Sequence, residues 1–110
     1  MIKEIYLKQP SEQETIKIDW SERANALVVA GYTISAIEVK VFDSGGGQDV
    51  TASMVNGSPS YSGTDIFVTL KNGTDGSDYS ARIRVTFSKT SYPDQIQEED
   101  LRIMVRQVGT

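Results

Sequence analysis

The segment from Ile66 to Phe87 constrains the fold of this chain more than any other. Two runs of alternating apolar and polar residues flank a loop of Gly, Asn and Asp, and Tyr79 opens the second run. Alternation with a period of two is typical of a half-buried β-strand. In antiparallel sandwiches, a tyrosine at such a place turns back and hydrogen-bonds a backbone group a few residues upstream. The segment therefore predicts two strands joined by a tyrosine corner over residues 71–79.

The same alternation recurs along the rest of the chain. It predicts further strands over residues 14–20, 33–43, 50–54 and 97–108. The side chains expected to face inward are Ile16, Ile18, Trp20, Ile37, Val39, Val41, Val50, Ala52, Met54, Ile66, Val68, Leu70, Tyr79, Ala81, Ile83, Val85, Phe87, Leu101, Ile103 and Val105. Ile34 and Ala36 are out of phase with this set, so we expect a β-bulge near Ser35 or Ala36.

Shorter segments complete the expected order of elements. Residues 2–8 predict a first strand. Ser21 is a suitable N-cap and favours a helical turn as far as Leu27. The apolar run 27–30 is expected either as a strand edge or as a cover over the end of the molecule. A hairpin loop is expected over 89–94 because this segment contains a proline.

These elements add up to seven to eight short strands. Turn residues (Gly, Ser, Asn and Asp) fall between the apolar runs, which is typical of all-β proteins. A length of 110 residues suits one domain. We therefore expect an all-β, immunoglobulin-like antiparallel β-sandwich that forms a single domain over residues 1–110.

Composition limits the functions open to such a fold. The chain has 15 acidic and 11 basic residues, and the resulting net charge of −4 disfavours binding to nucleic acid or to an anionic membrane. It has no Cys and no His, so it lacks thiolate chemistry, the commonest general base and the commonest ligand for zinc, copper or iron. We therefore expect no cofactor and no enzymatic activity.

The N-terminal residues also bear on where the protein is found. They contain no apolar core of a secretory signal and no small-residue cleavage site. No stretch approaches the ~20 apolar residues that a membrane-spanning helix needs. We expect a complete protein that is made and released into a cytoplasm.

The loop from Asn72 to Asp78 permits a metal hypothesis as well as a structural one. Its spaced oxygen side chains partly imitate a calcium-binding EF-hand loop, but the distal bidentate Glu and the flanking helices are missing. Gly and Asp are also what a tight β corner needs for its backbone angles. A weak Ca²⁺ site stays open as the alternative, and no metal ligand is assigned.

Charged residues permit two further hypotheses. Four basic residues gather on one outer sheet face if their strands pair, namely Arg82, Arg84, Arg102 and Arg106. They form either an anion or partner site, or a solvated face paired with carboxylates such as Glu98 and Asp100. Four carboxylates include possible pairs of the kind a glycosidase needs, namely Asp19, Glu22, Asp43 and Asp49. Nothing in their spacing brings two of them together, so no catalytic residue is assigned.

Aromatic residues are the best candidates for partner contacts. Four of them fall in expected loops or at outward positions, namely Tyr32, Phe42, Tyr61 and Tyr92. Exposed aromatics are enriched at protein interfaces. The alternative is that these rings cap the ends of a small core.

Several segments together match a known pattern. They are Ile18-Asp-Trp-Ser21, Ile34-Ser-Ala-Ile-Glu-Val39, Phe67-Val-Thr-Leu-Lys-Asn-Gly-Thr-Asp-Gly-Ser-Asp-Tyr79, Arg82-Ile-Arg-Val-Thr-Phe87 and Glu98-Glu-Asp-Leu-Arg-Ile-Met-Val105. With them the chain resembles a family of small phage and prophage tail-associated immunoglobulin-like proteins of the fiber–tail adaptor type. The family pattern has paired glycines at the corner and an Asp-Gly hairpin before the last strand, and this chain departs from both. The resemblance implies a virion structural role without catalysis, and it supplies no functional residues.

The residues and the resemblance together predict a non-enzymatic phage or prophage structural protein, a tail or neck adaptor that acts through protein–protein contacts. Its expected partners are other phage structural proteins and further copies of itself, and not nucleic acid, a membrane or a small-molecule substrate. We expect it in the virion, or in the bacterial cytoplasm before assembly. The alternative is an adhesion or carbohydrate-binding sandwich module of a bacterial surface protein, which would need an export route or fusion to a larger secreted chain.

Overall fold

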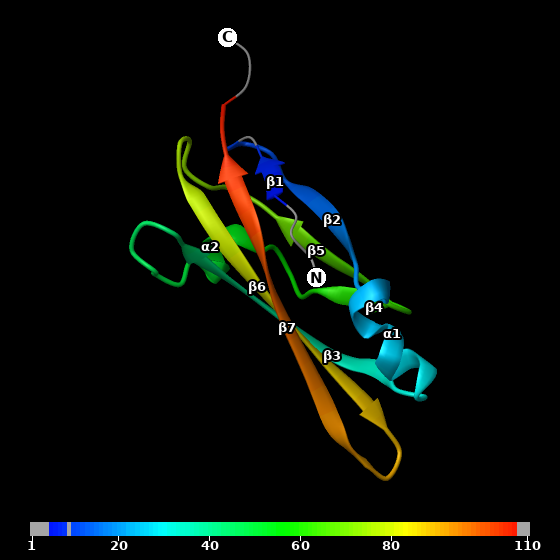
Figure 1. Cartoon of the computed structure of the whole chain (residues 1–110). Coiled ribbons are helices and arrows are strands. Elements are labelled where there is room, and N and C mark those ends of the chain that lie inside the picture. Colours follow the sequence, from blue (N-terminus) through cyan, green and yellow to red (C-terminus); the bar gives the residue numbers. More distant parts are fainter. Residues whose placement is uncertain (1–4, 9, 108–110) are drawn as a thin grey trace.

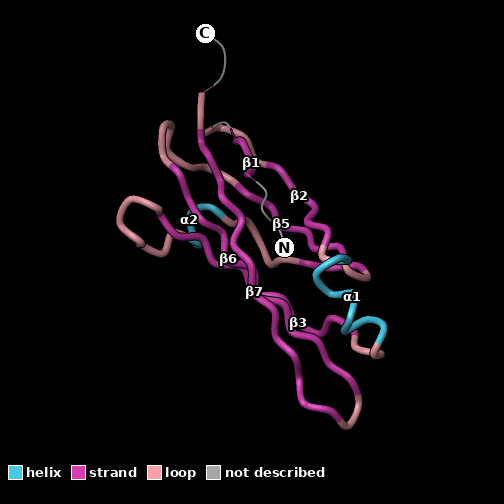
Figure 2. Tube along the Cα trace, viewed as in Figure 1, coloured by secondary structure: helices cyan, strands magenta, loops and turns pink. Residues whose placement is uncertain are grey.

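The computed structural model describes residues 5–8 and 10–107, which form a mostly β structure with one nine-residue helix and one short helical turn. Figure 2 shows the strands as the dominant element. In chain order the elements are β1 (Ile5–Lys8), β2 (Glu14–Asp19), α1 (Ser21–Val29), β3 (Thr33–Asp43), α2 (Thr51–Met54), β4 (Ser60–Ser62), β5 (Asp65–Leu70), β6 (Asp78–Lys89) and β7 (Tyr92–Val105). Among the described residues, no helix is long and apolar enough to cross a lipid bilayer.

The strands form two sheets. One has the order β1–β7–β6–β3 and the other the order β2–β5–β4. Strands β3, β6 and β7 pair antiparallel over most of their length. Figure 1 shows that they extend past the smaller sheet toward the β6–β7 turn. The inner face of the long sheet is therefore covered by the small sheet along only part of its length.

The expectation of purely antiparallel sheets is wrong at β1. This strand runs parallel to β7, with Ile5 opposite Arg102 and Lys8 opposite Val105. The chain leaves β1 for a strand of the other sheet, so no hairpin sets the direction of β1. The predicted residues 2–4 of this strand lie outside the described part of the chain.

Both sheets contribute to one hydrophobic core, and most of the predicted inward faces are confirmed. The predicted residues that are buried are Ile18, Trp20, Val39, Val41, Met54, Ile66, Val68, Leu70, Tyr79, Ala81, Ile83, Val85, Phe87, Leu101, Ile103 and Val105. Ile16 and Ile37 pack against this core but are only partly buried, because β2 and β3 are edge strands. The indole N–H of Trp20 donates to Gln97 Oε1 at 2.8 Å, which satisfies its one polar group inside the core.

The predicted β-bulge is confirmed. The register between β3 and β6 shifts between Ile34 and Ala36. The Ser35 hydroxyl lies 2.7 Å from that of Ser88 and donates to the Thr86 carbonyl at 3.3 Å. The extra residue thus keeps its polar group satisfied on the outer face of the sheet.

The tyrosine corner is also confirmed. The backbone N–H of Thr74 donates to the Tyr79 hydroxyl oxygen at 3.0 Å. Asn72 and Gly73 have φ values of 56° and 104°, which lie in the left-handed region. At Gly73 the space matters too, because a Cβ there would lie 2.8 Å from Val105 Cγ2. Lys8 is fully buried beside the corner and donates to the Asn72 carbonyl at 2.6 Å.

Helix α1 confirms the predicted helical turn and lengthens it to Val29. Ser21 is the first helical residue and not the N-cap, and its N–H is accepted by Asp19 Oδ1 at 2.9 Å. At the other end, Gly31 has a φ of 96°, its N–H donates to the Val28 carbonyl, and the next N–H, that of Tyr32, donates to Leu27. These bonds form a Schellman motif. The strand-edge alternative for residues 27–30 is therefore wrong.

The predicted strand over residues 50–54 is wrong as well. Thr51–Met54 forms the short helix α2, and its Met54 is buried. Asp49 Oδ1 accepts hydrogen bonds from the Thr51 N–H at 2.9 Å and from the Thr51 hydroxyl at 2.7 Å, and this local bonding favours a helical turn. Val50 and Met54 are four residues apart, a spacing that suits a helix as well as a strand.

The loop before the last strand is shorter than predicted. β6 ends at Lys89 and β7 begins at Tyr92, so only residues 90–91 form the turn. Ser91 adopts a φ of 70°, and the register of β6 with β7 shifts between Phe87 and Lys89, as in hairpins whose turn ends on a left-handed residue with a bulge. β7 is consequently longer than expected at its start and ends at Val105. Residue 108, the predicted end, lies outside the described part of the chain.

Candidate partner-binding surface

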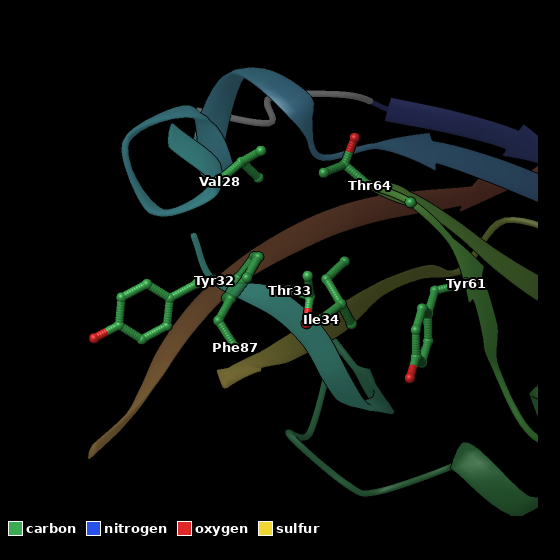
Figure 3. A pocket seen from close by; sticks show the side chains of 8 residues that line it. Val28, Tyr32, Thr33, Ile34, Tyr61, Thr64 and Phe87 are labelled. Atoms are coloured by element: carbon green, nitrogen blue, oxygen red, sulfur yellow. The ribbon is translucent and has the colours of Figure 1, made fainter. Parts of the chain in front are cut away.

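An open apolar groove of about 310 Å³ lies where the small sheet stops covering the long one. Its lining consists of Val28, Tyr32, Thr33, Ile34, Tyr61, Gly63, Thr64 and Phe87. Figure 3 shows Val28 and Thr64 on one side, Ile34 and Phe87 opposite, and the Tyr32 and Tyr61 rings at the two ends. No lining residue carries a charge. A concave apolar surface of this kind can hold the side chain of a partner. Its uncharged lining offers no acid or base for proton transfer.

Local structure on both sides holds the groove open. The Schellman motif at Gly31 turns the chain sharply from α1 into β3, which places Val28 and Tyr32 around the same space. Across the groove, the Thr64 carbonyl accepts a hydrogen bond from the backbone N–H of Trp20 at 2.9 Å. This bond ties the β4–β5 turn to the start of α1. Backbone hydrogen bonds therefore position the segments whose side chains line the groove.

A cluster of two aromatic rings and a lysine lies beside the groove. The Tyr32 and Tyr92 rings meet edge to face with centroids 6.5 Å apart. Lys89 Nζ lies 4.6 Å from the Tyr92 centroid and 5.8 Å from that of Tyr32, and donates to the Ala30 carbonyl at 2.6 Å. These contacts fasten the β6–β7 turn to the loop between α1 and β3. Tyr92 remains 57 % exposed and available to a partner.

The four predicted aromatic residues do not form one group. Tyr32, Tyr61 and Tyr92 surround the groove end, but Phe42 lies near the other end of β3. There it is half-buried, with the Arg82 guanidinium 5.1 Å above its ring. Tyr61 and Tyr92 lie in strands and not in loops, because β4 and the start of β7 include them. The partner-contact hypothesis therefore applies to three tyrosines, and Phe42 belongs to the charged outer face.

The four predicted arginines separate into two pairs with carboxylate partners. On the outer face of β6 and β7, Arg84 Nε lies 3.2 Å from Glu98 and Arg82 Nε 3.3 Å from the same carboxylate. Near the corner, Arg102 and Arg106 both bond Asp78, at 2.7 and 2.9 Å. This geometry favours the solvated, paired face over an anion site.

The carboxylates of the corner loop form hydrogen bonds with other groups of the chain. Hydrogen bonds from Arg102, which has the larger effect, and from Arg106 hold the pKa of the Asp78 carboxyl below its ordinary value. Asp75 Oδ1 accepts the backbone N–H of Gln107 at 2.9 Å. Within residues 5–8 and 10–107, no group of three or more acidic side chains is placed to hold a metal ion. The geometry thus favours the structural interpretation of the corner.

The predicted carboxylate pairs have local roles. Asp49 bonds Thr51, which lowers the pKa of its carboxyl, and Asp19 bonds Ser21 with the same effect. Asp43 Oδ1 accepts the Gly45 N–H at 2.8 Å in the glycine loop. Each of these carboxylates caps a turn or a helix start.

A comparison with protein families decides what kind of protein carries this groove. The family model described as "Podophage GP4 fiber-tail adaptor protein gp77" matches residues 8–103, which is most of the chain. The chain belongs to this podophage adaptor family. Members of a fiber-tail adaptor family are structural components of the phage tail and not enzymes. No curated protein and no solved structure matches the chain.

The matched region of this podophage adaptor contains every residue that lines the groove. Sequence reasoning found Tyr32 and Tyr61 but missed Val28, Thr33 and Thr64 as lining residues. It assigned Phe87 to the core, where its side chain is indeed fully buried. The missed residues come from α1, the start of β3 and the β4–β5 turn, and no periodicity in the sequence brings these segments together. The apolar run Leu27-Val-Val-Ala30 was the available signal in the sequence, and in the structure its Val28 and Val29 are exposed.

Proposed function

We propose that this podophage adaptor joins the fiber to the tail by binding other structural proteins at its groove end. The observation that carries the proposal is the family match over residues 8–103. The geometry adds an uncharged groove flanked by exposed apolar side chains. Val28 is 46 %, Tyr61 43 % and Tyr92 57 % exposed. Tyrosine is among the residues that provide most of the binding energy in protein interfaces.

The outer face of the long sheet is a weaker candidate for the same role. Its arginines already pair with Glu98 and Asp100. Exposed ion pairs contribute little binding energy, and breaking them to form new ones gains little more. The groove has no such internal partners to displace, which favours it as the contact surface.

Finer features belong to the same proposal. The two sheets and the tyrosine corner support an immunoglobulin-like sandwich that forms a single domain over residues 1–110. We also propose that the gene can lie in a prophage, and that the protein stays in the bacterial cytoplasm until it joins the virion. Several copies around a symmetric tail would contact each other as well as their partners.

The proposal is tested by a nonsense mutation in the gene. Purified particles from a non-suppressing host should contain the head and the tail but lack fibers, and supplying the wild-type chain in trans should restore them. Electron microscopy and mass spectrometry of the particles measure both outcomes. Particles that keep their normal fibers without this chain would refute an adaptor role.

A simpler observation tests the phage assignment independently. The genes on either side should encode capsid, tail or packaging proteins, whether in a phage genome or in a prophage. A neighbourhood of surface-protein genes, together with binding on a glycan array, would instead favour a carbohydrate-binding module.

A further inference from the structure

We propose that the outer edge of β3, together with the apolar groove, binds an extended uncharged segment of another tail protein, which adds to the long sheet as a new strand. This inference rests on the proposed adaptor function and specifies how the partner is held. In this binding mode, backbone hydrogen bonds give affinity and a pocket for one side chain gives specificity. The structure places both components side by side, because Thr33 and Ile34 belong to the edge strand and also line the groove.

The backbone of β3 is open over most of its outer edge. Among the described residues, β6 is the only strand that pairs with β3, and an isolated bridge joins Phe42, near the end of β3, to Asp49. Toward the C-terminal end of β3, the outward backbone groups of Val41 already have partners. Its N–H donates to Thr51 Oγ1 at 2.8 Å, and its carbonyl accepts the Val50 N–H at 2.8 Å. Because antiparallel strands alternate the direction of their polar groups, Val39 and Ile37 present their N–H and C=O groups on the same side as Val41. These groups are available to a fifth strand.

The other open edges of the described chain carry features that discourage strand addition. The uncovered part of β7 contains Pro93 and the carboxylates of Asp94, Glu98 and Asp100. The edge of β2 alternates charged residues with apolar ones, β4 has only three residues, and the edge strand β1 has only four. Proline, charges and short length are the usual ways in which proteins protect sheet edges. The stretch from Thr33 to Ile37 has no charge and no proline.

The charge of the site defines its occupant. Neither the stretch 33–37 nor the lining of the groove contains a charged side chain, although the whole chain has a net charge of −4. A charged side chain buried there would lose its hydration without gaining a partner. The occupant is therefore an uncharged segment that carries one large apolar residue at the position facing Phe87. Ile37, which is only partly buried at the edge, gains cover from the added strand.

Two neighbouring valines provide a matched pair of variants. Val28 lines the groove and Val29 does not, yet both lie in the last turn of α1 and both are exposed, at 46 % and 79 %. Lysine at either position changes the net charge equally and is favourable near a helix C-terminus. Val28→Lys places a charge at the groove, and Val29→Lys is its control.

A second pair of variants tests the backbone part of the site. Ile37→Pro removes an outward N–H while leaving the bonds to β6 in place, and edge positions tolerate proline. Ile37→Val keeps the N–H and serves as its control. A melting curve for each variant verifies that it is folded.

The probe is an array of overlapping peptides, each about 12 residues long so that it can pair along the whole open edge, taken from the fiber and tail proteins of the same phage. We expect uncharged, alternating segments to bind the wild-type chain. Val28→Lys and Ile37→Pro should weaken that binding by at least about 10-fold, Val29→Lys should change it by less than about 2-fold, and Ile37→Val should bind more tightly than Ile37→Pro.

Three results with the peptides would overturn the inference. They are the absence of any peptide that binds, binding to highly charged peptides only, and equal binding by Val28→Lys and Val29→Lys. A wild-type dimer that Ile37→Pro converts to a monomer would show that a second copy occupies the edge, and would refute the proposed occupant. If intact tail proteins still bind Val28→Lys and Ile37→Pro normally, the strand-docking inference fails while the adaptor function stands.

Discussion

The two ends of β6 differ in how their chemical groups are satisfied. At the Asp78 end, the corner pairs almost every polar group: Tyr79 accepts from Thr74, Lys8 donates to Asn72, and Asp78 bonds two arginines. At the Lys89 end, an apolar groove remains open and tyrosine rings face solvent. The corner is organised for stability, whereas the groove end leaves apolar surface exposed at a cost that a binding partner would remove.

This difference separates two kinds of substitution. Changes at the corner should lower the free energy of unfolding, because they leave buried groups without partners or force backbone to move. Changes at the groove end should leave folding nearly intact and alter binding. The following predictions test that separation, beginning with the largest expected effect.

Gly73→Ala should be the most damaging of the small substitutions. The new Cβ would lie 2.8 Å from Val105 Cγ2 on a backbone with a φ of 104°, and together strain and overpacking should cost about 3 kcal/mol. Urea unfolding measures this loss. Gly76→Ala is the control, since its φ is also positive at 86° but nothing lies within 4 Å of the new Cβ; it should cost about 1 kcal/mol. Equal losses would show that the packing at Gly73 is looser than described.

Tyr79→Phe should cost about 1 kcal/mol or more, because the Thr74 N–H loses its acceptor in a partly buried site. Tyr92→Phe, at a ring that is 57 % exposed, should change stability by less than about 0.5 kcal/mol. Thermal and urea unfolding of both variants give the comparison. If the two variants are equally stable, the Tyr79 hydroxyl does not stabilise the corner.

Acid should weaken the corner through Asp78. Arg102 and Arg106 lower the pKa of this carboxyl in the folded chain. Its stabilising contribution is therefore complete above the unfolded-state pKa and is lost as the pH falls through the lower, folded-state pKa. Asp78→Asn should reduce the loss of unfolding free energy between neutral pH and about pH 2. Part of the pH dependence of the unfolding free energy should remain in this variant, because the pKa values of Asp19 and Asp49 are also lowered. An unchanged pH profile in Asp78→Asn would contradict this account of the corner.

Tyr61→Ala should affect binding more than folding. The side chain lies at the groove on a three-residue edge strand and is 43 % exposed, so the change in unfolding free energy should stay below about 1 kcal/mol. Its effect should appear instead as weaker binding to the tail partner, measured by calorimetry. A variant that loses stability but binds normally would reverse the roles assigned to the two ends.

The sequence predicted the corner end much better than the groove end. Ile66, Val68 and Leu70 alternate cleanly, and Tyr79 bonds a group only five residues away, so local pattern contains the information. The groove joins α1, β4 and β6 through tertiary packing, which has no local signal. Helix α2 was missed because Val50 and Met54 fit both periodicities, and the direction of β1 was missed because a crossover between sheets leaves it undetermined.

We expect the tail partner to bind at the groove end. Hydrogen exchange of the chain, free and bound to its purified tail partner, can locate the contact, because each backbone amide reports its own protection. We predict slower exchange on binding for amides of residues 28–39 and 60–64, with no change over the corner at 71–79. Protection confined to the corner, with the groove amides unchanged, would contradict the claim.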